Sequence, residues 1–241
     1  MSIDWSVIFR EFPRICKDYY GFSENYTIQL LFGIKDVKGI ISLFDNISSS
    51  DKGKIEDLLA EIRFIYLFKN CGWTVEIIPK SAGPTPDLKV MSDFFSSLIE
   101  IKNIRWRNPG PSTVNNNTEQ FLLEEHGDFC RDEEKIRDKV FEAVDQIYFY
   151  KDRDPNDIPI IALWSSDGEI EEIDVKFSMQ RIIDEMRDQK PDFPNGILIF
   201  GNGWIYQNMK YLPYPIPIRE PFNHKLQAIA SKITSISIQC N

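Results

Sequence analysis

The chain has 241 residues, which is enough to bury a sizeable core in one domain of ordinary to large size. Its contents of 42% hydrophobic and 13% aromatic residues exclude an intrinsically disordered chain. The formal net charge of −9 opposes general electrostatic attraction to nucleic acid, although a local basic groove or a bound cation can offset it.

Cysteine usage and the lengths of the apolar runs bear on the compartment. The four cysteines show neither metal-ligand spacing nor a disulfide framework: Cys16, Cys71, Cys130 and Cys240. No run of 18 apolar residues is present, and charged residues interrupt the N-terminal segment. We therefore expect a soluble, cytoplasmic protein that does not enter a membrane.

Residues 1–48 are predicted to form a helical N-terminal extension to a main domain that covers residues 49–241. Apolar residues recur at helical spacing over residues 5–19. Apolar runs at 26–34 and 37–46 predict two shorter helices that pack on the first one. Structural cover is the favoured role of this extension, with substrate recognition or dimerisation as the alternatives.

A helix is predicted over residues 54–70, followed by a strand over residues 73–78. Glu61 lies at the edge of the apolar stripe of this helix, whose members share helical spacing: Ile55, Leu58, Leu59, Ile62, Ile65 and Tyr66. Glu61 can therefore either reach inward toward the strands that follow or remain in solvent. Glu56 and Asp57 are alternatives on the same helix.

Residues 86–91 and 97–102 are predicted to form a hairpin of two antiparallel strands. A register symmetric about its tight turn places Asp87 opposite Glu100. Cβ atoms of directly opposed residues are roughly 4.5–5.5 Å apart, so these two carboxylates repel each other. A divalent cation would offset that repulsion, and a hard ion such as Mg²⁺ binds carboxylate oxygens together with water and phosphate.

The same register pairs Met91 with Ser96 and Val90 with Ser97, and the alternation of side chains along a strand separates two faces. One face is wholly apolar: Leu88, Val90, Ile99 and Ile101. Lys102 lies on the other face, together with the two carboxylates. Its ammonium could orient or help to deprotonate a water, or stabilise charge on a phosphate.

The hairpin carries a motif of Pro86-Asp87, a spacer of twelve residues and then Glu100-Ile101-Lys102. This motif resembles that of the PD-(D/E)XK nuclease superfamily, with apolar residues in the expected places around it. The resemblance implies a restriction-endonuclease-like α/β core, in which helices flank a mixed β-sheet.

The segment before the motif also resembles this superfamily. Members often place a metal-binding glutamate on a helix that ends shortly before a glycine, an aromatic residue and a strand. Glu61, Gly72 and Trp73 match that order. The resemblance covers residues 54–102 well and the rest of the chain in outline.

Arg105, Trp106 and Arg107 follow the hairpin directly and are candidates for contact with nucleic acid. Arginine binds phosphate in a forked geometry, and tryptophan stacks on exposed bases. The same residue types are also common on ordinary surfaces. The polar stretch over residues 108–131 is either a lid over the site or an insertion without a role.

A helix is predicted over residues 132–150. Within it, Gln146 and Tyr150 resemble a Gln-x-x-x-Tyr element found in one branch of the superfamily, and Gln146 lies 44 residues after Lys102. The resemblance implies that Gln146 holds a phosphate or a water at the site. The alternative is a surface glutamine beside a core tyrosine.

The remainder of the chain adds buried strands at 159–164 and 196–200, and helices at 178–189 and 222–235. Prolines predict an extended connector over residues 211–217. The two strands would extend the antiparallel meander that precedes them through helical crossovers. This pattern favours an α/β protein with a mixed sheet.

The resemblance implies a metal-dependent endonuclease that hydrolyses DNA phosphodiester bonds, in a setting such as restriction or anti-phage defence. Asp87, Glu100, Glu61 and the backbone carbonyl of Ile101 would bind one or two Mg²⁺ ions, for which Mn²⁺ would substitute. Lys102 would act near the attacking water. Cutting both strands of a duplex would commonly call for a homodimer.

Two alternatives stay open at this point. A nuclease-like domain without catalytic activity could serve as a binding or assembly module, which the acidic charge and the N-terminal extension favour. The presence of Asp87, Glu100 and Lys102 together favours catalysis instead. An RNA endonuclease is the other alternative, because metal-dependent phosphodiester cleavage is common to DNA and RNA.

Overall fold

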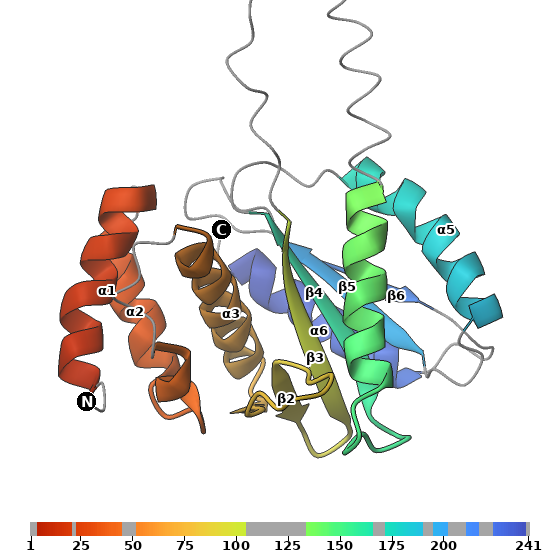
Figure 1. Ribbon diagram of the computed structural model, residues 1–241, viewed down its shortest axis with the longest axis horizontal. Coiled ribbons are helices and arrows are strands. Elements are labelled where there is room, and N and C mark those ends of the chain that lie inside the picture. Colours follow the sequence, from red (N-terminus) through yellow and green to blue (C-terminus); the bar gives the residue numbers. More distant parts are fainter. Residues whose placement is uncertain are drawn as a thin grey trace, which may run out of the picture.

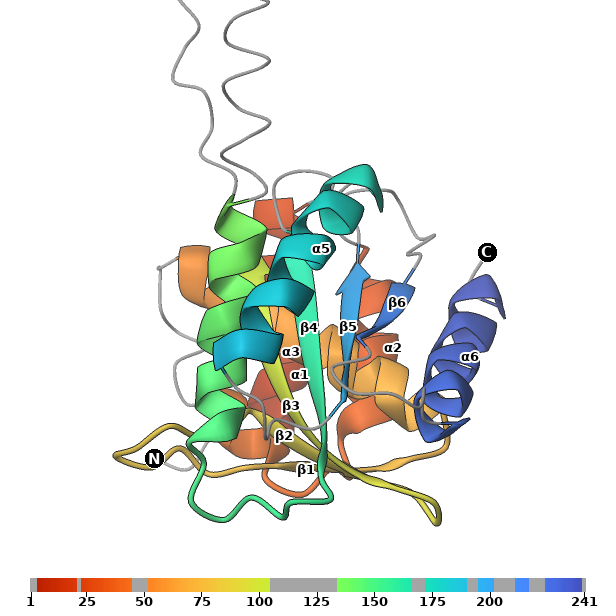
Figure 2. The ribbon, with the colours of Figure 1, turned by 90° about the vertical axis from the view of Figure 1, so that its right-hand side faces the viewer.

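A computed structural model shows that the chain forms a mixed β-sheet with helices on both faces (Figures 1 and 2). The structure describes residues 4–20, 23–44, 52–104, 134–165, 172–189, 195–201, 211–216 and 224–239. Within them, six strands form one sheet in the order β1-β2-β3-β4-β5-β6. Their bounds are β1 Thr74–Ile77, β2 Leu88–Met91, β3 Ser96–Ile104, β4 Ile158–Ser165, β5 Gly196–Gly201 and β6 Tyr211–Ile216.

The predicted antiparallel meander and its register are confirmed. β1 pairs with β2 and β2 with β3, both antiparallel, while β3, β4 and β5 are parallel neighbours. Within the hairpin, Met91 pairs with Ser96 and Val90 pairs with Ser97. The α/β class with a mixed sheet therefore follows from the sequence as predicted.

Helices cover both faces of this sheet. Their bounds are α1 Trp5–Tyr20, α2 Glu24–Ile34, the 3-10 helix η1 Ile40–Phe44, α3 Lys52–Asn70, a helix over residues 134–148, α5 Glu172–Gln189 and α6 His224–Gln239. The 134–148 helix is the unlabelled green helix of Figure 1, and it lies with α5 on the face opposite α3 and α6. Among the helices in the described ranges, none has the length and apolar character needed to cross a membrane.

The alternation of side chains along the strands divides the core into two layers. The apolar face predicted for the hairpin packs in the layer of α3: Leu88, Val90, Ile99 and Ile101. Leu98 and Ile104 point the other way and pack with Val140 and Ile147 of the 134–148 helix. Glu100 and Lys102 share the face of Leu98, so the charged side chains of β3 point toward this helix.

The N-terminal helices belong to the same apolar cluster as α3 and the sheet. Phe12 of α1 and Phe44 of η1 are fully buried, and their ring centroids are 5.5 Å apart. The three helices predicted in this part of the chain are observed as α1, α2 and η1. The domain boundary predicted at residue 48 lies outside the described residues.

One predicted connector is wrong. Residues 211–216 form the edge strand β6, antiparallel to β5, where an extended proline-rich connector was expected. Pro213 and Pro215 occupy alternate positions, so their missing amides fall on one side of the strand. An edge strand needs amides toward its single neighbour only, and it therefore accepts prolines at every second residue. The helix α5 also begins earlier than predicted, at Glu172.

Gly33 of α2 lies against the ring of Tyr66 on α3. A Cβ atom at this position would come within 2.4 Å of that ring. Alanine normally stabilises a helix over glycine by roughly 0.8–1.0 kcal/mol. Here the ring must move, so we expect Gly33→Ala to lower the free energy of unfolding by about 1–2 kcal/mol.

Urea denaturation measures this change, and Gly83→Ala is the control. A Cβ atom at Gly83 meets nothing within 4 Å, so that variant should stay within about 0.5 kcal/mol of wild type. A Gly33→Ala variant more stable than wild type would contradict the close contact between α2 and α3.

Candidate active site

A buried polar cluster lies where β3 extends beyond β2. Leu88, the first residue of β2, pairs with Ile99, so the rest of β3 continues past this end of the hairpin. α3 and the 134–148 helix both reach this part of β3 and line a pocket of about 270 Å³ with it. Asp87, Glu100 and Lys102 belong to this cluster, and their exposed fractions are 6%, 2% and 9%.

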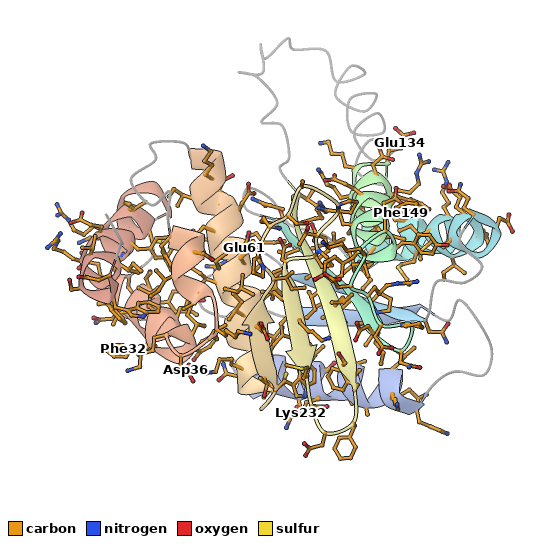
Figure 3. The ribbon with its side chains drawn as sticks, turned by 60° about the horizontal axis from the view of Figure 1, so that its bottom comes forward. Phe32, Asp36, Glu61, Glu134, Phe149 and Lys232 are labelled. Atoms are coloured by element: carbon orange, nitrogen blue, oxygen red, sulfur yellow. The ribbon has the colours of Figure 1, made fainter. Side chains whose placement is uncertain are left out.

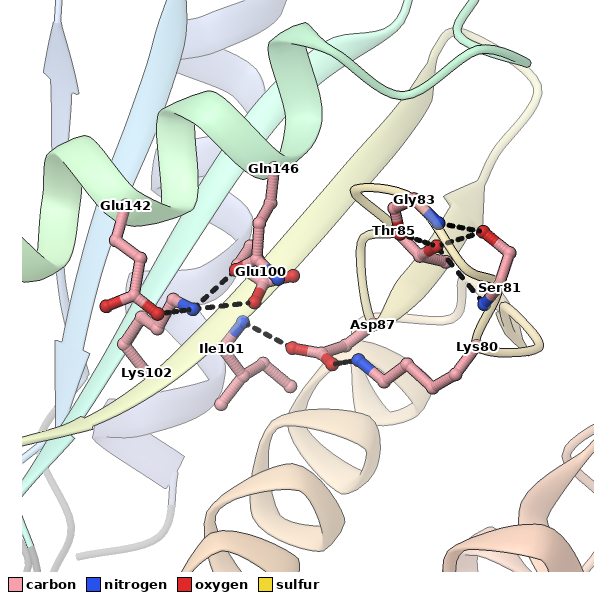
Figure 4. A network of polar contacts seen from close by, with 10 residues as sticks. All are labelled: Lys80, Ser81, Gly83, Thr85, Asp87, Glu100, Ile101, Lys102, Glu142 and Gln146. Atoms are coloured by element: carbon pink, nitrogen blue, oxygen red, sulfur yellow. Dashed lines mark hydrogen bonds and ion pairs between the residues drawn. The ribbon is translucent and has the colours of Figure 1, made fainter.

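Asp87 directly precedes β2 and is held against β3 by two hydrogen bonds. Its amide donates to the carbonyl of Ile99 at 3.0 Å, and its Oδ2 accepts the amide of Ile101 at 2.8 Å. The observed register ends at the pair Leu88–Ile99, and the Asp87 amide bonds to that same Ile99, so the direct pairing of Asp87 with Glu100 stays a prediction, although the charge of Asp87 does act on Glu100. The other carboxylate oxygen, Oδ1, accepts a hydrogen bond from the ammonium of Lys80 (Figure 4).

Lys102 has three acceptors around its ammonium. The distance from Nζ is 3.0 Å to Glu100 Oε1 and 2.7 Å to Glu142 Oε1, and Nζ also donates to Gln146 Oε1 (Figure 4). Burial opposes the charged form, but Glu100 and Glu142 outweigh it and hold the pKa of Lys102 above its ordinary value. Lys102 is thus a fixed positive charge with all three N–H donors in use.

Two of these partners come from the 134–148 helix, far away in sequence. Gln146 was predicted at the site, and the structure brings it into contact with Lys102 across 44 residues. Glu142 was not predicted. Its spacing of four residues from Gln146, which places both side chains on one helical face, is the signal that could have identified it. Lys139 binds the second carboxylate oxygen of Glu142 at 2.8 Å.

Glu61 lies on the side of α3 that faces the hairpin (Figure 3). It lines the pocket with Ile101 and Lys102 and is half-buried, so it lies at the pocket and is not fully solvated. Asp57, one of the alternatives on the same helix, lines the pocket as well and accepts a hydrogen bond from Asn103 at 3.2 Å. Glu56 is buried but does not line this pocket.

Burial and neighbouring negative charge disfavour the ionised forms of Glu61 and Glu100. Burial and the charge of Asp87 raise the pKa of Glu61, although Lys80 opposes the shift. Burial and Asp87 likewise raise the pKa of Glu100, against the opposing charge of Lys102. The protein without metal therefore holds more acidic groups here than its own cations stabilise in ionised form.

The carboxylate oxygens of this cluster are of the kind that a hard divalent cation binds. Glu100 Oε2 is buried and has no hydrogen-bond partner, and it lies beside a carboxylate that repels it. In the part of the chain that the structure describes, no three histidine, cysteine or acidic side chains are already grouped closely enough to hold a metal ion. Lys80 and Lys102 each pair with one carboxylate of the cluster instead, Asp87 and Glu100 respectively.

Other predicted site residues lie elsewhere. Arg105, Trp106 and Arg107, and the polar stretch over residues 108–131, lie outside the described residues. Tyr150 follows the end of the 134–148 helix and packs beside the second apolar layer, where its hydroxyl faces Asp152. Tyr150 is therefore not brought to the cluster around Lys102.

Comparison with known proteins adds no assignment to this geometry. No protein-family model matches the chain, and no curated protein matches it at a significant level.

Proposed function

We propose that this chain is a Mg²⁺-dependent endonuclease with a restriction-endonuclease-like core that hydrolyses DNA phosphodiester bonds. The observation that carries the proposal is the buried set of Asp87, Glu100 and Lys102, in which Glu100 Oε2 has no hydrogen-bond partner. Leaving such a group unpaired lowers the free energy of unfolding by roughly 1–3 kcal/mol or more. A hairpin with a purely structural role would gain nothing in return for this loss. A cation-binding role accounts for that cost.

The side chains would divide the chemistry among them. A bound Mg²⁺ ion supplies Lewis-acid activation of water and stabilises negative charge on the leaving oxygen. Asp87 and Glu100 would hold the ion, with Glu61 and the carbonyl of Ile101 as further oxygen donors. The hydrogen bond from the Ile101 amide keeps the Asp87 carboxylate oriented for this purpose.

Lys102 would act through its charge. Glu100 and Glu142 hold the pKa of Lys102 above its ordinary value, which favours the charged form. Its ammonium would orient the attacking water or stabilise charge on the phosphate. Gln146 would support this role by holding the ammonium in place, because its side-chain oxygen accepts a hydrogen bond from Lys102.

A second candidate is a nuclease-like module that binds or assembles without cutting. The observation that favours it is the neutralisation of Asp87 by Lys80 and of Glu100 by Lys102, which compensates both carboxylates without a metal. Metal binding separates the two candidates, because a module of this kind has no need for Mg²⁺ or Mn²⁺.

Cleavage assays test the proposal directly. Supercoiled plasmid, single-stranded DNA and RNA are incubated with Mg²⁺, Mn²⁺ or EDTA. We expect nicking or linearisation of DNA with either metal and none with EDTA. Cleavage of RNA alone would favour the RNA endonuclease instead, and linear product formed in single binding events would support a homodimer. Absence of both metal binding and cleavage would favour the binding module.

Glu142 is expected to act as a positioning residue for Lys102. Glu142→Ala removes one of the three acceptors of the ammonium, so cleavage should fall by roughly 10- to 100-fold. Glu142→Gln keeps an acceptor oxygen and should retain most of the activity. Steady-state cleavage rates of the two variants measure the difference. Equal losses in both variants would contradict this role for the hydrogen bond.

A further inference from the structure

Lys80 holds the oxygen of Asp87 that a metal ion would need. Asp87 Oδ2 is already bound by the amide of Ile101, and Oδ1 is bound by the Lys80 ammonium (Figure 4). The Asp87 side chain is buried, whereas the side chain of Lys80 is 63% exposed. The long side chain of Lys80 therefore reaches from the surface and places its positive charge next to the buried carboxylate of Asp87.

The loop between β1 and β2 keeps Lys80 in reach of this carboxylate. Thr85 is buried, and its hydroxyl donates to the carbonyl of Gly83 at 2.9 Å. The hydroxyls of Ser81 and Thr85 are 2.7 Å apart and share a hydrogen bond. These contacts close the loop immediately after Lys80, so its position next to Asp87 is built into the fold.

Acidic groups other than Asp87 also attract the ammonium of Lys80. Glu100 and Glu61 both attract its positive charge, in addition to Asp87. These three carboxylates are the ones proposed to hold the metal. Lys80 thus brings one positive charge to the place where the donor set favours a cation.

We propose that Lys80 is an internal counter-ion that a divalent metal displaces, and that the displaced ammonium then contacts a phosphate of the nucleic-acid substrate. This inference rests on the proposed function. Its tether leaves the ammonium at the mouth of the site after displacement, where a phosphate bound to the metal would lie within its reach. Removing the charge should therefore tighten metal binding and weaken substrate binding, whereas general damage to the site would weaken both.

The metal arm of the test uses Mn²⁺ alone and isothermal titration calorimetry. The apparent dissociation constant of wild type equals the intrinsic constant divided by the fraction of protein in which Lys80 leaves Asp87 free, so Lys80→Met should bind Mn²⁺ about 10-fold more tightly. Lys38→Met is the matched control, because Lys38 is also paired with a carboxylate, Glu76, but on the exposed surface. It should stay within about twofold of wild type.

The substrate arm measures KM for plasmid cleavage at saturating Mn²⁺, where we expect KM to rise in Lys80→Met and not in Lys38→Met. Tighter Mn²⁺ binding with a higher KM supports the full proposal. Tighter binding with an unchanged KM supports the counter-ion and overturns the phosphate contact. If wild type and Lys80→Met bind Mn²⁺ equally, the counter-ion role is wrong while the proposed function stands. If neither protein binds Mn²⁺, both are wrong.

Discussion

Asp87→Asn is expected to lower metal-dependent DNA cleavage by about 10³-fold, because an ion in this position contributes several kcal/mol of transition-state stabilisation. The asparagine side chain has the size of aspartate and keeps an oxygen that can accept the hydrogen bond from the backbone N–H of Ile101, so the hairpin should remain intact. It removes the negative charge that the ion requires. Nicking of supercoiled plasmid in Mg²⁺, with EDTA as the blank, measures the loss.

Asp36→Asn is the matched control for this variant. Asp36 is also a carboxylate bound by a lysine, Lys69, but it lies on the surface away from the pocket (Figure 3). Its substitution should leave cleavage unchanged. Circular dichroism establishes that both variants are folded. An Asp87→Asn protein that still cuts DNA at the wild-type rate would exclude Asp87 as a metal ligand.

Glu100→Gln is expected to stabilise the protein in the absence of metal while abolishing its activity. Burial and the charge of Asp87 raise the pKa of Glu100 from 4.5 to about 8. The folded protein therefore binds more protons than the unfolded chain between these values, and its stability falls as the pH rises through this window. The glutamine does not ionise, so this loss of stability is absent from the variant.

The size of the effect depends on pH in a defined direction. At pH 8 the variant should be more stable by about 1–3 kcal/mol, the range for relieving a buried unpaired group. In a chain of this length that corresponds to a rise in Tm of roughly 2–10 °C. At pH 5 both proteins should unfold at similar temperatures, because Glu100 is then largely protonated in wild type. Thermal unfolding followed by circular dichroism in EDTA measures both.

Two further thermal unfolding measurements complete this experiment, one with Mn²⁺ added and one on a variant of a surface glutamate. Mn²⁺ should raise the Tm of wild type and have little effect on Glu100→Gln, since a ligand stabilises only the protein that binds it. Glu24→Gln removes an exposed glutamate that is paired with Lys17 and should show no gain at pH 8. A Glu100→Gln variant less stable than wild type at pH 8 would show that the carboxylate is well accommodated without metal.

The hairpin shows how far local pattern can determine a site. Side chains alternate with a period of two, so the apolar positions of both strands admit one register, and the structure has that register from Met91 and Ser96 to Leu88 and Ile99. Lys102 lies on the same face as Glu100 for the same reason. These predictions needed no knowledge of the rest of the fold.

The sequence analysis did not identify Lys80 as a site residue, and it predicted a connector where the structure has the strand β6. Lys80 reaches Asp87 because hydrogen bonds between side chains close the loop after it, and loop paths of this kind leave no periodic signal. The proline-rich residues 211–216 form a strand because β5 offers an edge that needs only alternate amides. The loop contacts follow no periodic pattern, and the pairing of β6 depends on the edge that β5 presents in the folded sheet.

The sequence by itself determined the α/β class, the hairpin register and the common face of Glu100 and Lys102, because these depend on the period of side chains along neighbouring strands. Only the tertiary structure decided that Glu61 lies at the pocket, that Glu142 joins Gln146 at Lys102, and that Lys80 neutralises Asp87. These contacts depend on how α3 and the 134–148 helix dock on the sheet, which follows from long-range burial rather than local spacing.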